Sequence, residues 1–218
     1  MKPRLKLYMH PLSSYCQKAL VALYENATPF EPVIVNLMDP ASAAAFKEMW
    51  PTGKFPVLRD EDRDQVIPES TVIIEYLDQY YPGTTRFIPA DPDAERLTRA
   101  RDRFIDLYIH MEMQKVVGDR LRPQDRRDPL GVEQARTKMH TALSLLDRDM
   151  TGQTWAMGEA FSLADCSACP ALYYANLVMP LGEKYPNVAG YFERLLQRPS
   201  FARAVKEAEP YRHMFPKA

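Results

Sequence analysis

The sequence predicts a small mixed α/β domain followed by a larger domain made only of helices. Up to Tyr81, stretches with the two-residue period of strands alternate with stretches at helical spacing, whereas from Pro92 onward every apolar stripe has helical spacing. Between them, the segment PGTTRFIPADPDA is rich in proline, glycine and threonine and poor in helix formers, which is typical of a connector. We therefore expect domains over residues 1–81 and 92–218, joined by a linker over 82–91.

The first domain has the expected element order β-α-β-α-β-β-α. Residues 5–8 alternate as a strand does, and a helix follows whose apolar positions are Cys16, Ala19, Leu20 and Leu23. A second strand is expected over 30–35 and a helix over 41–50, and the runs FPVL and QVIP around the charged turn RDEDRD predict a hairpin. The closing helix lies within 69–81, and its apolar stripe consists of Val72, Ile73, Tyr76, Leu77 and Tyr80.

Three long helical segments dominate the second domain. A stripe of apolar residues normally faces a core, and the first stripe comprises Leu97, Ala100, Phe104, Leu107, Tyr108 and Met111. The second stripe comprises Ala135, Met139, Leu143 and Leu146. The third segment, FSLADCSACPALYYANLVM, is very apolar, opens with a capping box of Ser162 and Asp165, and precedes two shorter helices. An apolar helix with a strong cap is expected at the centre of the domain.

Composition argues against several classes of protein. The chain is 46% hydrophobic and 26% charged, and its formal net charge of -1 provides no field that would attract nucleic acid or anionic lipid. Its three cysteines, Cys16, Cys166 and Cys169, do not resemble a disulfide framework and favour a reducing, cytoplasmic location. No run of 18 apolar residues occurs, and Pro11 interrupts the N-terminal stretch, so neither a membrane span nor a signal peptide is expected.

Four motifs together resemble the cytosolic glutathione S-transferases, and they span the chain. HPLSSYCQKAL lies where that family carries its thiol-activating residue, and GKFPVL is similar to its cis-proline loop. PESTVIIEYLDQYYP resembles its Glu-Ser helix start, and FSLADC resembles its capping box. The resemblance implies a thioredoxin-like N-terminal domain, an all-α C-terminal domain, a homodimer, and glutathione as co-substrate without a metal ion. It also implies a cytoplasmic transferase of the detoxification type.

The resemblance assigns the glutathione-binding residues to two loops. Glu69 and Ser70 would hold the γ-glutamyl end, since a serine hydroxyl and free amides at a helix N-terminus suit a carboxylate. Phe55 would pair its backbone with the cysteinyl unit, and Pro56, at the start of a strand, favours a cis bond. Lys54 resembles the basic residue that meets the glycine carboxylate in tau-like members. The alternatives are an ordinary helix cap for Ser70 and a solvated turn lysine for Lys54.

A single hydroxyl at a helix N-terminus is sufficient to activate a thiol. A thiol with a pKa of about 8.5 is only a few per cent ionised at pH 7, and lowering that pKa by about two units requires about 2.7 kcal/mol. The register of the family's serine-type motif places Ser13 at the activating position. Ser14 stays an alternative, because an error of one residue is common at a loop-to-helix junction. Cys16 lies nearly one helical turn further on and is expected to point away.

Other chemically suggestive residues have simpler explanations. Cys166 and Cys169 lie inside an apolar helix without a second ligand pair, which favours buried packing over a redox or zinc site. The four histidines show no metal-ligand spacing. Arg96, Arg99 and Arg103 share a helix face that is expected to be solvated, with dimer contacts as the second interpretation.

The resemblance also implies an apolar electrophile pocket between the domains. Its candidate residues, for which core packing is the alternative, are Leu12, Tyr108, Met111, Tyr211 and Phe215. The expected function is attack of the glutathione thiolate on an apolar electrophile by conjugation, halide displacement or ether cleavage. The segment ESTVIIEYL also resembles the bacterial glutathione-dependent etherases, so cleavage of a β-aryl ether is one form of this expectation. The motifs do not specify the electrophile, which depends on the shape of the pocket.

Two other functions compete with this expectation. A zeta-like isomerase is disfavoured, because SSYCQK lacks the tryptophan and the paired arginines of that class. The alternative of a different kind is a non-catalytic binding or regulatory protein, similar to the stringent-starvation-like partners of RNA polymerase. The joint presence of Ser13, the Phe55-Pro56 pair and the Glu69-Ser70 pair argues against it, because a scaffold has no need of a complete tripeptide receptor.

Overall fold

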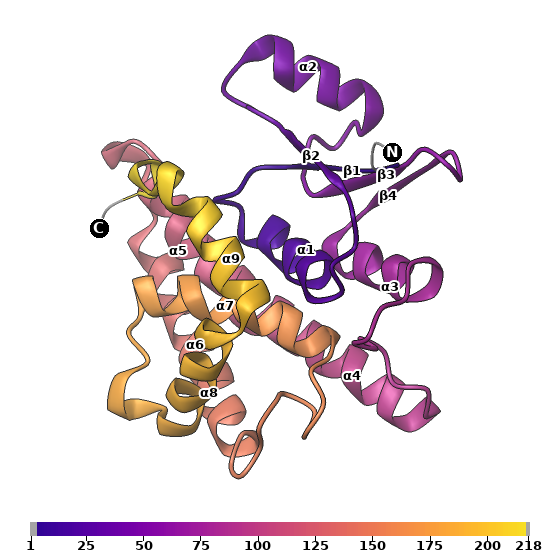
Figure 1. Cartoon of the computed structure of the whole chain (residues 1–218). Coiled ribbons are helices and arrows are strands. Elements are labelled where there is room, and N and C mark those ends of the chain that lie inside the picture. The colour runs from indigo at the N-terminus through magenta and orange to yellow at the C-terminus, as the bar shows by residue number, and fades with distance from the viewer. Residues whose placement is uncertain (1–3, 217–218) are drawn as a thin grey trace.

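A four-stranded sheet with three helices lies beside a bundle of helices in the computed structural model, which describes residues 4–216 (Figure 1). The strands are β1 (Leu5–Met9), β2 (Glu31–Ile34), β3 (Val57–Asp60) and β4 (Gln65–Pro68). The helices of this part are α1 (Ser14–Glu25), α2 (Pro40–Met49) and α3 (Ser70–Tyr80). The predicted order β-α-β-α-β-β-α is therefore confirmed.

The sheet has the strand order β2-β1-β3-β4, in which β1 runs parallel to β2 and antiparallel to β3. Successive residues of a strand point to opposite faces. Leu5, Leu7 and Met9 accordingly join α1 and α3 in the main core, whereas Tyr8 packs beside Phe46 of α2 on the other face. The sheet is thus covered on both faces, and the loop after β1 leads directly into α1.

The helical part begins at Pro92, and residues 81–91, all described, contain neither helix nor strand. Its first helix is continuous through three segments, α4 (Pro92–Phe104), the π-helix η1 (Ile105–His110) and α5 (Met111–Arg120). The remaining helices are α6 (Pro129–Asp149), α7 (Leu163–Val178), α8 (Pro186–Gln197) and α9 (Pro199–Ala208), with 3-10 turns η2 (Gln124–Arg126), η3 (Gly182–Lys184) and η4 (Glu209–Met214). In the described part of the chain, no helix combines the length and apolar character needed to cross a membrane.

Helix α7 lies at the centre, as predicted, and packs against α1, α4, α5 and α8. Its N-terminus is held by Asp165, whose Oδ2 accepts hydrogen bonds from the Ser162 amide at 2.8 Å and the Ser162 hydroxyl at 2.9 Å. Cys166 and Cys169 are fully buried, and burial raises the pKa of both thiols well above the ordinary value. The packing interpretation of this cysteine pair is therefore confirmed. Helix α9 runs beside α1, so the helical part packs against the part that contains the sheet (Figure 1).

One predicted core face is wrong. The stripe along α4 and η1 is largely exposed: Leu97 is 49% exposed, Leu107 39% and Tyr108 54%. The buried side of the same helix carries Asp102 instead, because Lys18 of α1 binds its carboxylate at 2.6 Å and both side chains lie out of solvent. The buried positions of α4 are polar, so no apolar period marked them. Further along the same helix the buried face includes Ile105, Ile109, Met113 and Val116, which the predicted stripe left out. The second predicted stripe, over α6, is buried as expected.

Candidate active site

A cavity of about 400 Å³, here called the polar cavity, lies between the loop before β3, the start of α3 and the helix α4–η1. The five residues assigned to glutathione all line it: Lys54, Phe55, Pro56, Glu69 and Ser70. The peptide bond between Phe55 and Pro56 is cis, as the sequence predicted. Lys54 makes no salt bridge to any described residue. Residues from two separate motifs thus converge on one cavity.

The N-terminus of α3 is suited to an anion. Ser70 is the first residue of the helix and is buried, and the preceding Glu69 makes no side-chain cap to the helix amides. The first amides of a helix lack acceptors within the helix and lie at the positive end of its dipole. Glu69 adopts a φ of 68°, a conformation that non-glycine residues rarely take and that is found most often at functional sites. A carboxylate can therefore be bound here.

Asp106 and Arg103 of the helix α4–η1 also line the polar cavity, and the sequence analysis missed the first of them. Oδ2 of Asp106 accepts a hydrogen bond from Lys18 Nζ at 2.7 Å, whereas its Oδ1 has no partner among the described residues. Burial would raise the pKa of Asp106, but the neighbouring His110 and the charge of Lys18 lower it to about 2. Asp106 is therefore an anion in the wall of the cavity, but its carboxylate is buried and already paired with Lys18.

The arginine face is largely solvated, as predicted, since the side chains of Arg96, Arg99 and Arg103 are 67%, 41% and 51% exposed. Arg96 pairs with Asp93 on the surface, as a solvated face predicts. Arg99 instead binds Glu75 of α3 as well as Glu95 of its own helix. Arg103 lies at the edge of the polar cavity, with its Nη1 3.8 Å from Asp106 Oδ2. The three arginines thus have three different environments.

The start of α1 distinguishes the three candidate thiol-activating residues. Ser13 is the N-cap, and its Oγ accepts the Cys16 amide at 3.4 Å, so the hydrogen of its hydroxyl is not donated to a described residue. Ser14 is buried, with its Oγ 2.6 Å from His110 Nε2 and accepting from Gln114 Nε2 at 2.8 Å. Cys16 is fully buried, and burial raises the pKa of its thiol to about 12. Of these three candidates, Ser13 alone has a hydroxyl whose hydrogen bond to a described residue is one that it accepts.

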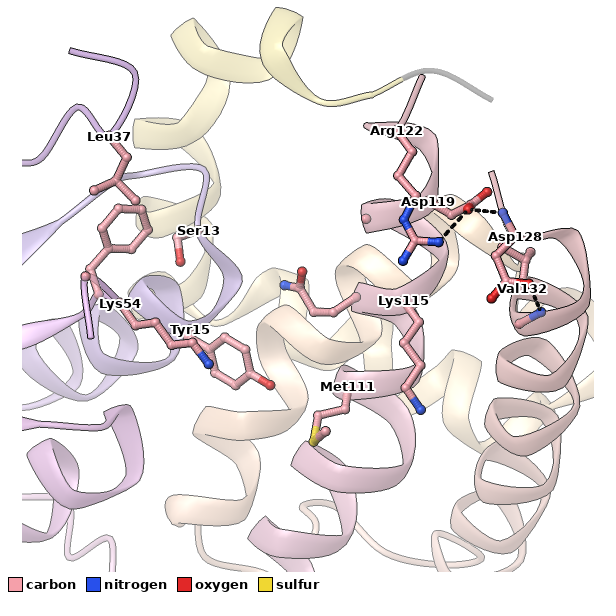
Figure 2. A pocket seen from close by; sticks show the side chains of 15 residues that line it. Ser13, Tyr15, Leu37, Lys54, Met111, Lys115, Asp119, Arg122, Asp128 and Val132 are labelled. Carbon is pink, nitrogen blue, oxygen red and sulfur yellow. Dashed lines mark hydrogen bonds and ion pairs between the residues drawn. The ribbon is translucent and has the colours of Figure 1, made fainter. Parts of the chain in front are cut away.

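Two further spaces meet the polar cavity at Phe55, which lines all three. The open cleft, of about 780 Å³, has Ser13, Tyr15 and Lys54 on one wall. Met111 and Lys115 of α5, and Arg122 just after that helix, lie opposite (Figure 2). The apolar cavity, of about 490 Å³, contains Ser13 in its wall as well. Ser13 therefore lies where the open cleft joins the apolar cavity.

The predicted electrophile residues are only partly brought together. Leu12 and Phe215 line the apolar cavity, and Met111 lines the polar cavity and the open cleft. Tyr211 packs its ring edge-on against His10, which lines the apolar cavity, at 4.8 Å between centroids. Tyr108 lies on the exposed face of η1 against Phe104 and lines none of the three spaces.

The apolar cavity also contains residues that the sequence analysis did not name. Tyr174 of α7 donates its hydroxyl hydrogen to the Leu12 carbonyl at 2.7 Å, and Gln114 lies between this cavity and the open cleft. Four exposed apolar side chains surround its mouth: Leu37, Met38, Leu121 and Met214. The very apolar composition of α7 was the available signal for Tyr174, while Gln114 had none.

Comparisons with known proteins agree with this architecture. The family model described as "Glutathione S-transferase, N-terminal domain" matches residues 7–85, and the model of the C-terminal domain of that family matches residues 108–199. Among curated relatives, glutathione S-transferase Z2 of Arabidopsis thaliana is 29% identical over 213 residues, covering 95% of this chain and 93% of the relative. A stringent starvation protein A homolog of Haemophilus influenzae is 28% identical, covering 90% of this chain and 87% of the relative.

Among solved structures, a glutathione S-transferase from Methylobacillus flagellatus KT with glutathione bound is 30% identical. The match covers 92% of this chain and 98% of the Methylobacillus chain, with a TM-score of 0.83. A glutathione S-transferase from Methylobacterium radiotolerans, in complex with glutathione sulfonate, is 27% identical with a TM-score of 0.81. The match covers 93% of this chain and 94% of the Methylobacterium chain. The chain belongs to the glutathione S-transferase family.

Proposed function

We propose that this protein binds glutathione in the polar cavity, ionises its thiol beside Ser13 and directs the thiolate at an apolar electrophile. The observation that carries the proposal is the convergence of Lys54, Phe55, Glu69 and Ser70 on one cavity that continues to Ser13 through the open cleft. The similar Methylobacillus protein, whose structure contains glutathione, supports the choice of ligand.

The polar cavity offers a partner for each charged group of the tripeptide. The α-carboxylate of the γ-glutamyl unit would lie at the N-terminus of α3 beside Ser70, and its ammonium group would lie against the carboxylate of Glu69, which lines the same cavity. The backbone of Phe55 would bind the cysteinyl unit, and the unpaired Lys54 would meet the glycine carboxylate. The thiol would then lie toward the start of α1.

Ser13 would activate the thiol by donating its free hydroxyl hydrogen to the thiolate. The first turn of α1 adds the positive end of a helix dipole at the same point. A hydrogen bond to a charged acceptor contributes about 1.5–3 kcal/mol, which is enough for most of the required pKa shift.

The electrophile would enter the apolar cavity, whose wall includes Leu12, Tyr174 and Phe215. The proposed reactions are conjugation, halide displacement and cleavage of an aryl ether. Turnover measured on a panel of aryl halides, alkyl halides, enones and aryl ethers would identify the reaction. Failure of every member to react in the presence of glutathione would contradict the enzymatic proposal.

We also propose a cytoplasmic homodimer. Helix α3 and the helix α4–η1 carry exposed apolar residues, including Val72, Leu97 and Leu107, and α3 is joined to α4 by the ion pair of Arg99 with Glu75. Exposed apolar side chains of this kind are candidates for burial between two copies of the chain. The buried, free state of Cys16, Cys166 and Cys169 fits a reducing compartment.

A second candidate is a non-catalytic protein of the same fold, since relatives named stringent starvation protein A homologs match almost the whole chain. Retention on immobilised glutathione distinguishes the two functions. The enzyme is expected to be retained and to be eluted by free glutathione, and Ser70→Ala is expected to be retained less. A wild-type protein that passes through the column would favour the non-catalytic candidate.

A further inference from the structure

His110 is a buried histidine that contacts the residue next to the proposed thiol activator. It ends the π-helical segment η1 and is fully buried, and its Nε2 lies 2.6 Å from Ser14 Oγ. The ring of Tyr15 stacks on the imidazole with 3.9 Å between centroids. π-helical turns occur mostly as single insertions and frequently at functional sites. The histidine is therefore held in one orientation toward the start of α1.

The second ring nitrogen of His110 faces a carboxylate. Nδ1 lies 3.6 Å from Asp106 Oδ1, and neither of these buried atoms has a hydrogen-bond partner among the described residues. A bare Nδ1 beside a carboxylate oxygen would bring two acceptors together, so the proton of the neutral ring belongs on Nδ1. Nε2 is then an acceptor, and the Ser14 hydroxyl donates to it.

The surroundings of His110 carry excess negative charge. Lys18 Nζ binds both Asp102, at 2.6 Å, and Asp106, at 2.7 Å, so two buried carboxylates share one buried ammonium group. Arg103 approaches Asp106 only to 3.8 Å and is half exposed. A buried charge without a counter-charge destabilises the fold, and a proton on His110 would compensate the excess negative charge of Asp102 and Asp106. Tyr15, Ser14 and Gln114, which face the ring or its serine partner, add no charge at neutral pH.

The imidazole of His110 is neutral, and can therefore accept a proton, while the cleft is empty. Burial and the charge of Lys18 lower the pKa of His110, and Asp106 opposes these effects only in part, so the neutral form is present near pH 7. A thiolate formed nearby would add a negative charge and would raise the affinity of the ring for a proton. Ser14 lines the apolar cavity together with Ser13 and Phe55, which is the wall where the proposed function puts the thiol.

We propose that Ser14 and His110 take the proton of the glutathione thiol, so that ionisation of the thiol releases no proton to solvent. This inference rests on the proposed function. The S–H bond breaks and its proton passes to the free lone pair of Ser14 Oγ, while the original hydroxyl proton of Ser14 moves to His110 Nε2. The products are a thiolate that accepts a hydrogen bond from Ser14 and an imidazolium between Ser14 and Asp106. Gln114 occupies the other lone pair of Ser14 and keeps the hydroxyl aligned.

The test counts protons as glutathione binds. Calorimetric titration near pH 7 in buffers of different ionisation enthalpy gives the protons released per site, and ultraviolet absorbance gives the fraction of bound thiol that is ionised. We expect the wild type to form the thiolate with no net release of protons to solvent. His110→Gln keeps a hydrogen-bonding group beside Ser14 but cannot hold the proton, so we expect about one proton released per thiolate formed.

The matched control is His140→Gln, which changes a histidine that is bound to Tyr185 and lies outside the three spaces of the active site. It is expected to behave as the wild type. A wild type that releases one proton for each thiolate overturns the proton path while leaving the proposed function intact, and this measurement needs no variant. Absence of glutathione binding, or binding without thiolate, overturns both the proposed function and the proton path.

Discussion

Replacing Ser13 by alanine tests the proposed activation of glutathione most directly. The hydroxyl of Ser13 accepts one long hydrogen bond, from the Cys16 amide at 3.4 Å, and donates to no described residue, so its hydrogen is free for the thiolate. Ser13→Ala removes that donor and leaves the backbone amides of the first turn in place. The variant therefore isolates the hydrogen bond from the effect of the helix dipole.

The size of the effect follows from the charge on the acceptor. Losing one hydrogen bond to a charged group costs about 1.5–3 kcal/mol, which raises the pKa of the bound thiol by about one to two units. Loss of the helix cap lowers the free energy of unfolding by about 1 kcal/mol and leaves the protein folded. Ser13→Thr keeps the hydroxyl and serves as the matched control.

The assay is a pH titration of bound glutathione by the ultraviolet absorbance of its thiolate. Cys16 adds no background, since burial raises the pKa of its thiol to about 12, and Cys16→Ala is expected to titrate as the wild type. An unchanged pKa in Ser13→Ala would refute the assignment. A rise in Ser14→Ala without one in Ser13→Ala would make Ser14 the direct donor.

Three other predictions concern binding, assembly and acid stability. Ser70→Ala is expected to raise KM for glutathione with nearly unchanged kcat, because the bound carboxylate is remote from the reacting sulfur; steady-state kinetics with an unaltered KM would contradict this. Sedimentation is expected to show a dimer that Leu107→Asp dissociates, and a wild type that sediments only at 25.1 kDa at micromolar concentration would exclude the dimer. The pKa of Asp106 is lowered to about 2, so its carboxylate stabilises the fold above the unfolded-state pKa of about 3.9, and this contribution is lost as the pH falls toward 2. Urea unfolding at a series of pH values should therefore show a smaller loss of stability in acid for Asp106→Asn than for the wild type, and equal slopes would argue against an anionic Asp106.

Local sequence patterns determined most of the architecture. The alternating periods before Tyr81 and the helical periods after Pro92 predicted the element order, because strand and helix each impose their own spacing on the residues that face a core. The capping box of Ser162 and Asp165 was predictable for the same reason, since its partners are three residues apart. Motifs also selected Lys54, Phe55, Glu69 and Ser70, which the structure places in one cavity.

Tertiary structure alone decided which polar residues are buried around the start of α1. Lys18 meets Asp102 and Asp106 across 84 and 88 residues of chain, and Ser14 meets His110 across 96. The buried side of the helix α4–η1 carries Asp102 and Asp106 together with the apolar Ile105 and Ile109, so Leu107 on the other side faces outward. The spacing of apolar residues along one helix predicts which of its faces is buried by hydrophobic packing. Burial of a charged side chain depends instead on a partner from another helix, which that spacing does not indicate. Only the folded chain therefore shows that a carboxylate, a histidine and a serine lie in contact at the start of α1.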